Sequence, residues 1–141
     1  MAKQFKASGI LYSDGEKIGT TEYKIASDYL EKLVEISPKK LPVMNNWQWD
    51  SSDNIIGNAE LEYVNDGDGP HIIAHITFNQ FANRDYEQIL QSKERRKLRL
   101  GFYMNSVSLN TDDKLLHDGV IRSIMLSDTC CGGHIYKFGW E

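Results

Sequence analysis

Residues 58–78 read NAELEYVNDGDGPHIIAHITF, and they contain the clearest structural signal in the chain. Apolar and polar side chains alternate over 58–64, which is typical of a β-strand with one face in solvent. The turn-forming run DGDGP follows at 66–70, and apolar residues then recur at every second position over 71–78. Two alternating strands joined by such a turn predict a β-hairpin.

Similar patterns predict that most of the remaining chain is also β. Ser27, as an N-cap, begins a short amphipathic helix that ends before Pro38, and a second helix is predicted over 84–97. We therefore expect an α+β, mainly β fold that forms a single domain over residues 1–141. Further strands are predicted over 3–11, 20–25, 41–45, 98–104, 107–109, 120–126 and 134–138.

Composition narrows the class of protein. The chain has 141 residues and a net charge of −4, so we expect one domain that is not a dedicated nucleic-acid binder. It has no apolar run long enough to cross a membrane and no signal-peptide pattern at its start, so neither secretion nor a transmembrane segment is expected. The two cysteines, Cys130 and Cys131, are adjacent, which excludes a disulfide scaffold.

The sequence predicts no metal and no cofactor. It contains no Walker, GxGxxG, GxSxG or HExxH motif. His71 and His75 have the spacing of a helical metal pair, but on the predicted strand they lie about 13 Å apart. Cys130 and Cys131 are followed by no second pair of ligands with zinc-site spacing.

Two segments are candidate contact surfaces. One is a polar stretch with two large aromatic side chains, and the other places five bases within seven residues near the end of the predicted second helix. Tryptophan serves as a binding platform or packs on the core, and a basic helix end binds phosphate or an acidic protein, or is merely solvated. The residues are Trp47 and Trp49 in the first segment, and Lys93, Arg95, Arg96, Lys97 and Arg99 in the second.

Three parts of the chain, taken in order, resemble the prohead (capsid maturation) protease family of tailed bacteriophages. They are LPVMNNW at 41–47 with IGNAELE at 56–62, the strand 72–78 with the helix through Leu90, and LRLGFY at 98–103 with the strand 120–127. That family shares a β-barrel-like core with the herpesvirus assemblin proteases. The resemblance therefore implies a single-domain prohead-protease-like or assemblin-like β-barrel with two short helices.

The chain departs from the family at each catalytic position. Trp47 stands where the family has its histidine, Arg99 where it has its nucleophile, and Ser123 or Met125, depending on register, where it has its acidic residue. A serine nucleophile needs a general base and a group that orients the base, so we expect no catalysis by the family's triad. A rearranged site stays open, with Ser106 or Ser108 beside His71, His75 or His117.

The resemblance thus implies a structural or assembly protein of a bacteriophage capsid or virion with a catalytically degenerate protease fold. Its expected partners are the major capsid protein or other virion proteins; self-assembly stays open, and neither a membrane nor nucleic acid is expected. It would act in the virion, or in the host cytoplasm during assembly. The alternatives are an active maturation serine protease and a phage accessory module that binds a host protein or nucleic acid.

Overall fold

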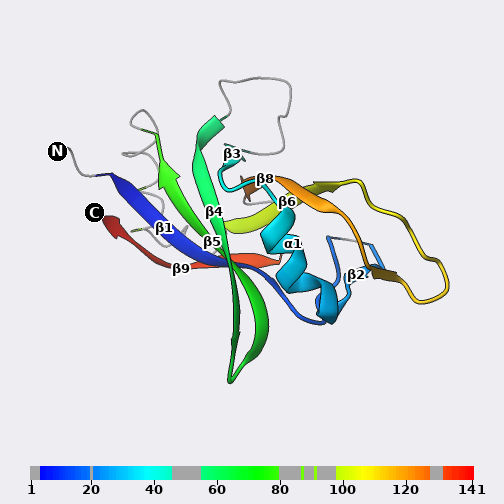
Figure 1. The fold of residues 1–141 in the computed structure, drawn as a ribbon. Helices are drawn as coiled ribbons and strands as arrows, with labels where there is room; N and C mark the ends of the chain where they lie inside the picture. The colour runs from blue at the N-terminus through cyan, green and yellow to red at the C-terminus, as the bar shows by residue number, and fades with distance from the viewer. Residues whose placement is uncertain are drawn as a thin grey trace.

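The computed structural model describes residues 4–19, 21–45, 55–79, 98–127 and 132–141, together with Glu87 and Gln91. The fold is mainly β, as predicted (Figure 1). The elements are β1 (Phe5–Ser13), β2 (Lys24–Ile25), the 3-10 turn η1 (Ser27–Tyr29), α1 (Leu30–Ile36), β3 (Leu41–Asn45), β4 (Ile55–Asp66), β5 (Gly69–Phe78), β6 (Arg99–Asn105), β7 (Leu115–Leu116), β8 (Val120–Ser127) and β9 (Gly133–Trp140).

Seven strands of the described chain close into a barrel in the order β1-β5-β4-β3-β8-β6-β9. β9 pairs with β1, and the two lie side by side in Figure 1. Neighbouring strands are antiparallel except β3 and β8, which are parallel. β2 and β7 form a separate two-stranded parallel sheet.

The hairpin predicted from 58–78 is confirmed as β4 and β5. Its register is unbroken from Gly57 opposite Phe78 to Asp66 opposite Gly69. The Asp66 carboxylate accepts a hydrogen bond from the Asp68 amide, and Gly69 has a φ of +96°, a conformation that favours glycine. Local turn chemistry therefore supports the register that the alternating side chains require.

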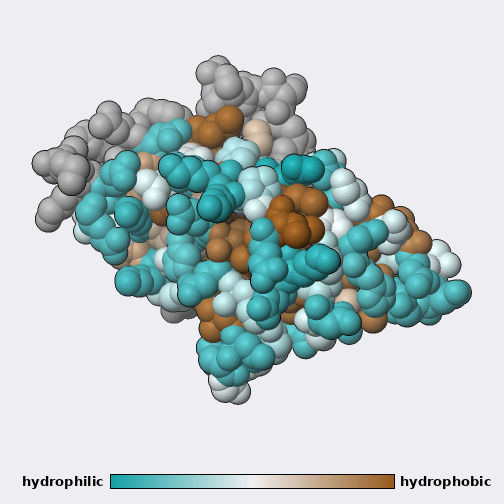
Figure 2. Space-filling view, in the orientation of Figure 1, coloured by the Kyte–Doolittle hydropathy of each residue, from teal (hydrophilic) through white to brown (hydrophobic). Residues whose placement is uncertain are grey.

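The barrel interior holds one hydrophobic core. Phe5 is fully buried, and its ring lies 5.6 Å from that of Phe78, 6.1 Å from that of Phe138 and 5.4 Å from that of Trp140. Helix α1 contacts β4, β5 and β8 and buries its apolar stripe. The outer faces of the strands are largely polar, and hydrophilic residues cover most of the view in Figure 2.

Of the strand predicted over 20–25, residue 20 lies outside the described chain, residues 21–23 are not a strand, and only Lys24–Ile25 is confirmed, as β2. The Thr21 hydroxyl donates to the Ile18 carbonyl oxygen at 2.6 Å and accepts a hydrogen bond from the Tyr23 amide at 3.2 Å. These bonds form a tight turn, because a threonine hydroxyl competes with strand pairing for nearby backbone groups.

The predicted return to β over 107–109 is also wrong. Ser106 has a φ of 59°, which turns the chain away from β6, and the Ser108 amide donates to the Asp118 carboxylate at 2.8 Å. The predicted N-cap at Ser27 is wrong as well, since its hydroxyl donates to Asp14 while a 3-10 turn precedes α1. The helix does end before Pro38, as predicted.

The second predicted helix, over 84–97, lies outside the described residues except for Glu87 and Gln91. Both have helical backbone, and the Gln91 side-chain amide donates to the Glu87 carboxylate at 3.4 Å.

A buried serine joins α1 to β8 and carries a testable prediction. The Ser37 hydroxyl donates to the Leu33 carbonyl oxygen at 2.6 Å and accepts a hydrogen bond from the Ile121 amide at 3.1 Å. Ser37→Ala leaves that buried amide without an acceptor, so we expect it to lower the free energy of unfolding by about 1–3 kcal/mol. Urea denaturation measures this, with Ser27→Ala, which removes an exposed hydroxyl, as the control. Equal losses in the two variants would contradict the prediction.

Candidate functional site

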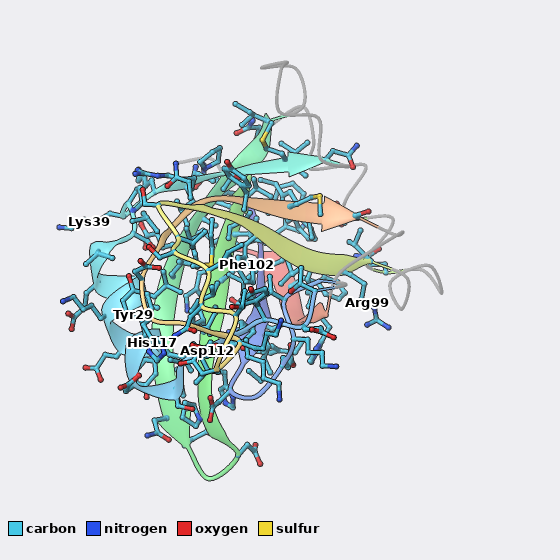
Figure 3. All side chains as sticks on the ribbon, turned by 90° about the vertical axis from the view of Figure 1, so that its right-hand side faces the viewer. Tyr29, Lys39, Arg99, Phe102, Asp112 and His117 are labelled. Atoms are coloured by element: carbon cyan, nitrogen blue, oxygen red, sulfur yellow. The ribbon has the colours of Figure 1, made fainter. Side chains whose placement is uncertain are left out.

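Arg99 lies at the start of β6, where the family resemblance places a serine nucleophile. Its side chain is exposed and extends away from the barrel (Figure 3). In the strand register, Arg99 is opposite Ser127 of β8 and also opposite His134 of β9. Ser127 and His134 are therefore two strand spacings apart, about 9–10 Å, which is too far for a direct hydrogen bond between matched positions.

The register also shows how the two residues that the resemblance offers for the acidic position lie relative to Arg99. Ser123, Met125 and Ser127 share one face of β8 because side chains alternate along a strand. Met125 is opposite Gly101, so it is the diagonal neighbour of Arg99, while Ser123 lies two residues further along. Both side chains are buried, and the Ser123 hydroxyl has no hydrogen-bond partner among the described residues. Neither position supplies a carboxylate.

A groove of about 470 Å³ lies on the outer face of the barrel, over β1, β5 and β9. One polar row crosses it, because Glu60 of β4, His75 of β5, Ser8 of β1 and Lys137 of β9 are successive neighbours in the strand register. Lys6, Tyr136, Trp140 and Glu141 also line the groove.

Ser8 and His75 line this groove, and they form a connected triad with Glu62 of β4. The Ser8 Oγ lies 2.8 Å from His75 Nδ1, and His75 Nε2 lies 2.8 Å from Glu62 Oε1. Strands β1, β5 and β4 each supply one of the three side chains. Each ring nitrogen of His75 therefore has a hydrogen-bond partner, and the two bonds fix the orientation of the imidazole.

The chemistry of Glu62 assigns the proton positions. An ionised carboxylate only accepts hydrogen bonds, so His75 Nε2 carries a proton and donates it to Glu62. In a neutral imidazole the other nitrogen is then an acceptor, and the Ser8 hydroxyl donates to Nδ1. A hydroxyl hydrogen-bonded to a base that is itself oriented by a carboxylate is the arrangement that activates a serine nucleophile.

The other serine and histidine candidates lie elsewhere in the structure, and both histidines contact carboxylates there. His71 Nε2 lies 3.3 Å from the Asp66 carboxylate, and His117 Nε2 lies 2.9 Å from that of Asp113. The hydrogen bond to Asp113 raises the pKa of His117 (Figure 3 shows its place). Ser106 and Ser108 lie on the loop after β6, and Ser106 bonds the neighbouring Asn105.

The predicted contact residues mostly lie outside the described part of the chain. Of the seven, only Arg99 is described. Sequence reasoning had included His75 among its candidates but missed Ser8 and Glu62. The sequence pattern that could have indicated Ser8 and Glu62 is the alternation of side chains, which places both residues on the polar faces of their strands. The residues outside the described part are Trp47, Trp49, Lys93, Arg95, Arg96 and Lys97.

Within the described ranges, no group of three or more His, Cys, Asp or Glu side chains is placed to hold a metal ion. Over the same residues, no helix is long and apolar enough to cross a membrane. Cys130 and Cys131 lie outside these ranges.

No protein-family model matches the chain, and no curated protein matches it.

Proposed function

We propose that this protein is a structural or assembly component of a bacteriophage capsid or virion, built on a prohead-protease-like barrel without the family's catalytic triad. The observation that carries the proposal is the register around Arg99. An exposed guanidinium stands at the position that the resemblance gives to the nucleophile; its direct neighbours are Ser127 and His134, and its diagonal neighbour on β8 is Met125. Guanidinium is no nucleophile at physiological pH, because arginine stays protonated.

The closed barrel supports this proposal, since a β-barrel core is the architecture that the resemblance implies. A barrel that keeps the fold but not the triad is suited to binding. Function depends on the residues of a site, and the same scaffold supports different functions when those residues change.

Charge suggests how the protein reaches its partner. Arg99 is exposed and ends a run of five bases within residues 93–99, in a chain whose net charge is −4. We propose that this basic run recruits the protein to an acidic surface of the major capsid protein or another virion protein. A shell repeats each contact site many times, so a weak contact at each site is sufficient.

The test is co-sedimentation with capsid shells over a salt series. We expect binding of the wild type to weaken steeply as salt rises, because exposed charges are screened over a Debye length of about 8–10 Å. Arg95→Glu/Arg96→Glu should weaken binding at physiological salt by about tenfold or more. Lys39→Glu/Lys40→Glu is the matched control, because it makes the same change in net charge on the exposed turn before β3.

Two outcomes would contradict the proposal. Absence of binding at any salt concentration would remove the capsid role. Salt-insensitive binding by the Arg95/Arg96 variant would exclude the basic run and favour the Trp47–Trp49 segment, since contacts made by buried tryptophan depend little on salt. Mass spectrometry of the same mixtures over time should show no cleavage of capsid protein, whereas specific cleavage would favour the protease alternative.

A further inference from the structure

We infer that the groove over β1, β5 and β9 is an acyl-transfer site in which Ser8 is the nucleophile, His75 the general base and Glu62 the group that orients the base. Its substrate class is a small, uncharged carboxylic ester. The inference does not rest on the capsid role, because it uses none of the residues around Arg99.

The distances within the triad fit nucleophilic catalysis. Both hydrogen bonds of the triad measure 2.8 Å, within the range for a nucleophile bound to its base and a base bound to its orienting group. Ser8 and His75 are direct partners in the β1–β5 register. The bond therefore joins two strands whose positions are set by the barrel.

The surroundings of the triad indicate the class of substrate. Charges of both signs border the groove, and the Lys6 ammonium lies 3.9 Å from the Glu141 carboxylate. Exposed Tyr136 and Trp140 add aromatic surface. Balanced charge and exposed rings favour an uncharged substrate with an apolar or aromatic group.

Negative charge develops on the carbonyl oxygen during the reaction, and a hydrogen-bond donor has to stabilise it. β1 pairs with β5 on one side and with β9 on the other. The backbone at Ser8 is therefore part of the hydrogen-bonded sheet, and a side chain has to supply the donor for the oxyanion. Lys137 is the β9 partner of Ser8 and also lines the groove, which makes its ammonium the candidate to stabilise the oxyanion. A side-chain donor of this kind suits esters, whose leaving groups are better than those of amides.

Hydrolysis of the ester at this site needs no reagent other than water. Ser8 Oγ attacks the ester carbonyl carbon while His75 Nδ1 takes the hydroxyl proton. The bond from carbon to the alcohol oxygen then breaks, and His75 returns the proton to that oxygen. Water next attacks the carbonyl carbon of the acyl-serine and gives a proton to His75. The bond from that carbon to Ser8 Oγ then breaks, and His75 returns the proton to Oγ, which releases the carboxylic acid and free Ser8.

The test treats the folded full-length protein with p-nitrophenyl acetate and locates the acetyl group by peptide mapping. We expect one acetyl group on Ser8 and release of p-nitrophenolate. Ser8→Ala should remove this acetylation, Ser8→Cys should retain acylation at position 8, and His75→Gln should slow it about 100-fold or more. Glu62→Gln should have a smaller effect, because Glu62 acts through His75.

The same strand pair offers a matched control. Ser13 is opposite His71 in the β1–β5 register, but His71 contacts Asp66. Ser13→Ala should leave acetylation of Ser8 unchanged, and Ser13 itself should stay unmodified. The inference is wrong if acetyl groups appear only on lysines, or if Ser8 reacts equally fast in the wild type and in His75→Gln.

Discussion

Phe5→Ala is expected to lower the free energy of unfolding by about 3–5 kcal/mol, the range for truncation of a buried aromatic side chain. Phe5 has no exposed surface, and its ring contacts those of Phe78, Phe138 and Trp140. These rings belong to β1, β5 and β9, so the cavity would open where β1 pairs with both of its neighbours. A domain of this size has about 5–15 kcal/mol of stability in total, so the expected loss is a large fraction of it.

Urea denaturation followed by fluorescence and by circular dichroism measures this effect. Tyr136→Ala is the control, since Tyr136 lies on β9 but is 52% exposed. The control should cost far less than Phe5→Ala. Similar losses in both variants would show that the ring cluster around Phe5 does not stabilise the barrel as its burial indicates.

Gly133→Ala is expected to destabilise the protein by about 3 kcal/mol, near the upper end of the usual cost of overpacking. A Cβ at Gly133 would lie 2.6 Å from the Ile10 carbonyl oxygen and 2.7 Å from that of Leu100, and neither backbone can move freely. In the described chain, β6 and β9 pair only through Arg99 with His134 and Leu100 with Gly133. The added methyl group therefore pushes β9 away from β1 and β6, at the strand pair with the fewest paired residues in the described barrel.

Gly139→Ala is a matched control on the same strand, because a Cβ at Gly139 would have nothing within 4 Å. We expect its effect to stay within about 0.5 kcal/mol. Hydrogen exchange should show that Gly133→Ala loses protection first at the amides of β6 and β9. If the two glycine variants were equally stable, the close approach at Gly133 would be unimportant.

The hairpin of β4 and β5 was predictable because its information is local. Alternation sets the face of each side chain, and the turn from Asp66 to Gly69 sets the register. The strand predicted over 20–25 was shorter than expected and the one over 107–109 was wrong, in each case because a single side chain diverted the backbone. Thr21 did so before β2, and Asp118 did so after β6.

The Ser8–His75–Glu62 triad shows the opposite case. Alternation places each of these residues on a solvent face, and the predicted hairpin makes the strands of Glu62 and His75 neighbours, but neither signal brings Ser8 of β1 next to β5. Ser8 and His75 are 67 residues apart in the chain, and they meet because β1 pairs with β5 when the barrel closes. The choice of Met125 over Ser123 as the neighbour of Arg99 likewise needed the β6–β8 register.

The amino-acid sequence by itself therefore determined the mainly β class, the β4–β5 hairpin and the absence of a serine at position 99. These follow from residue identity and from periodicity over a few neighbours. Only the tertiary structure decided the order of strands, the neighbours of Arg99 on β8 and β9, and the hydrogen bond that joins Ser8 to His75. Strand order depends on burying the apolar faces of all seven barrel strands together, with Phe5, Phe78 and Phe138 in one core, and no short stretch of sequence contains that condition.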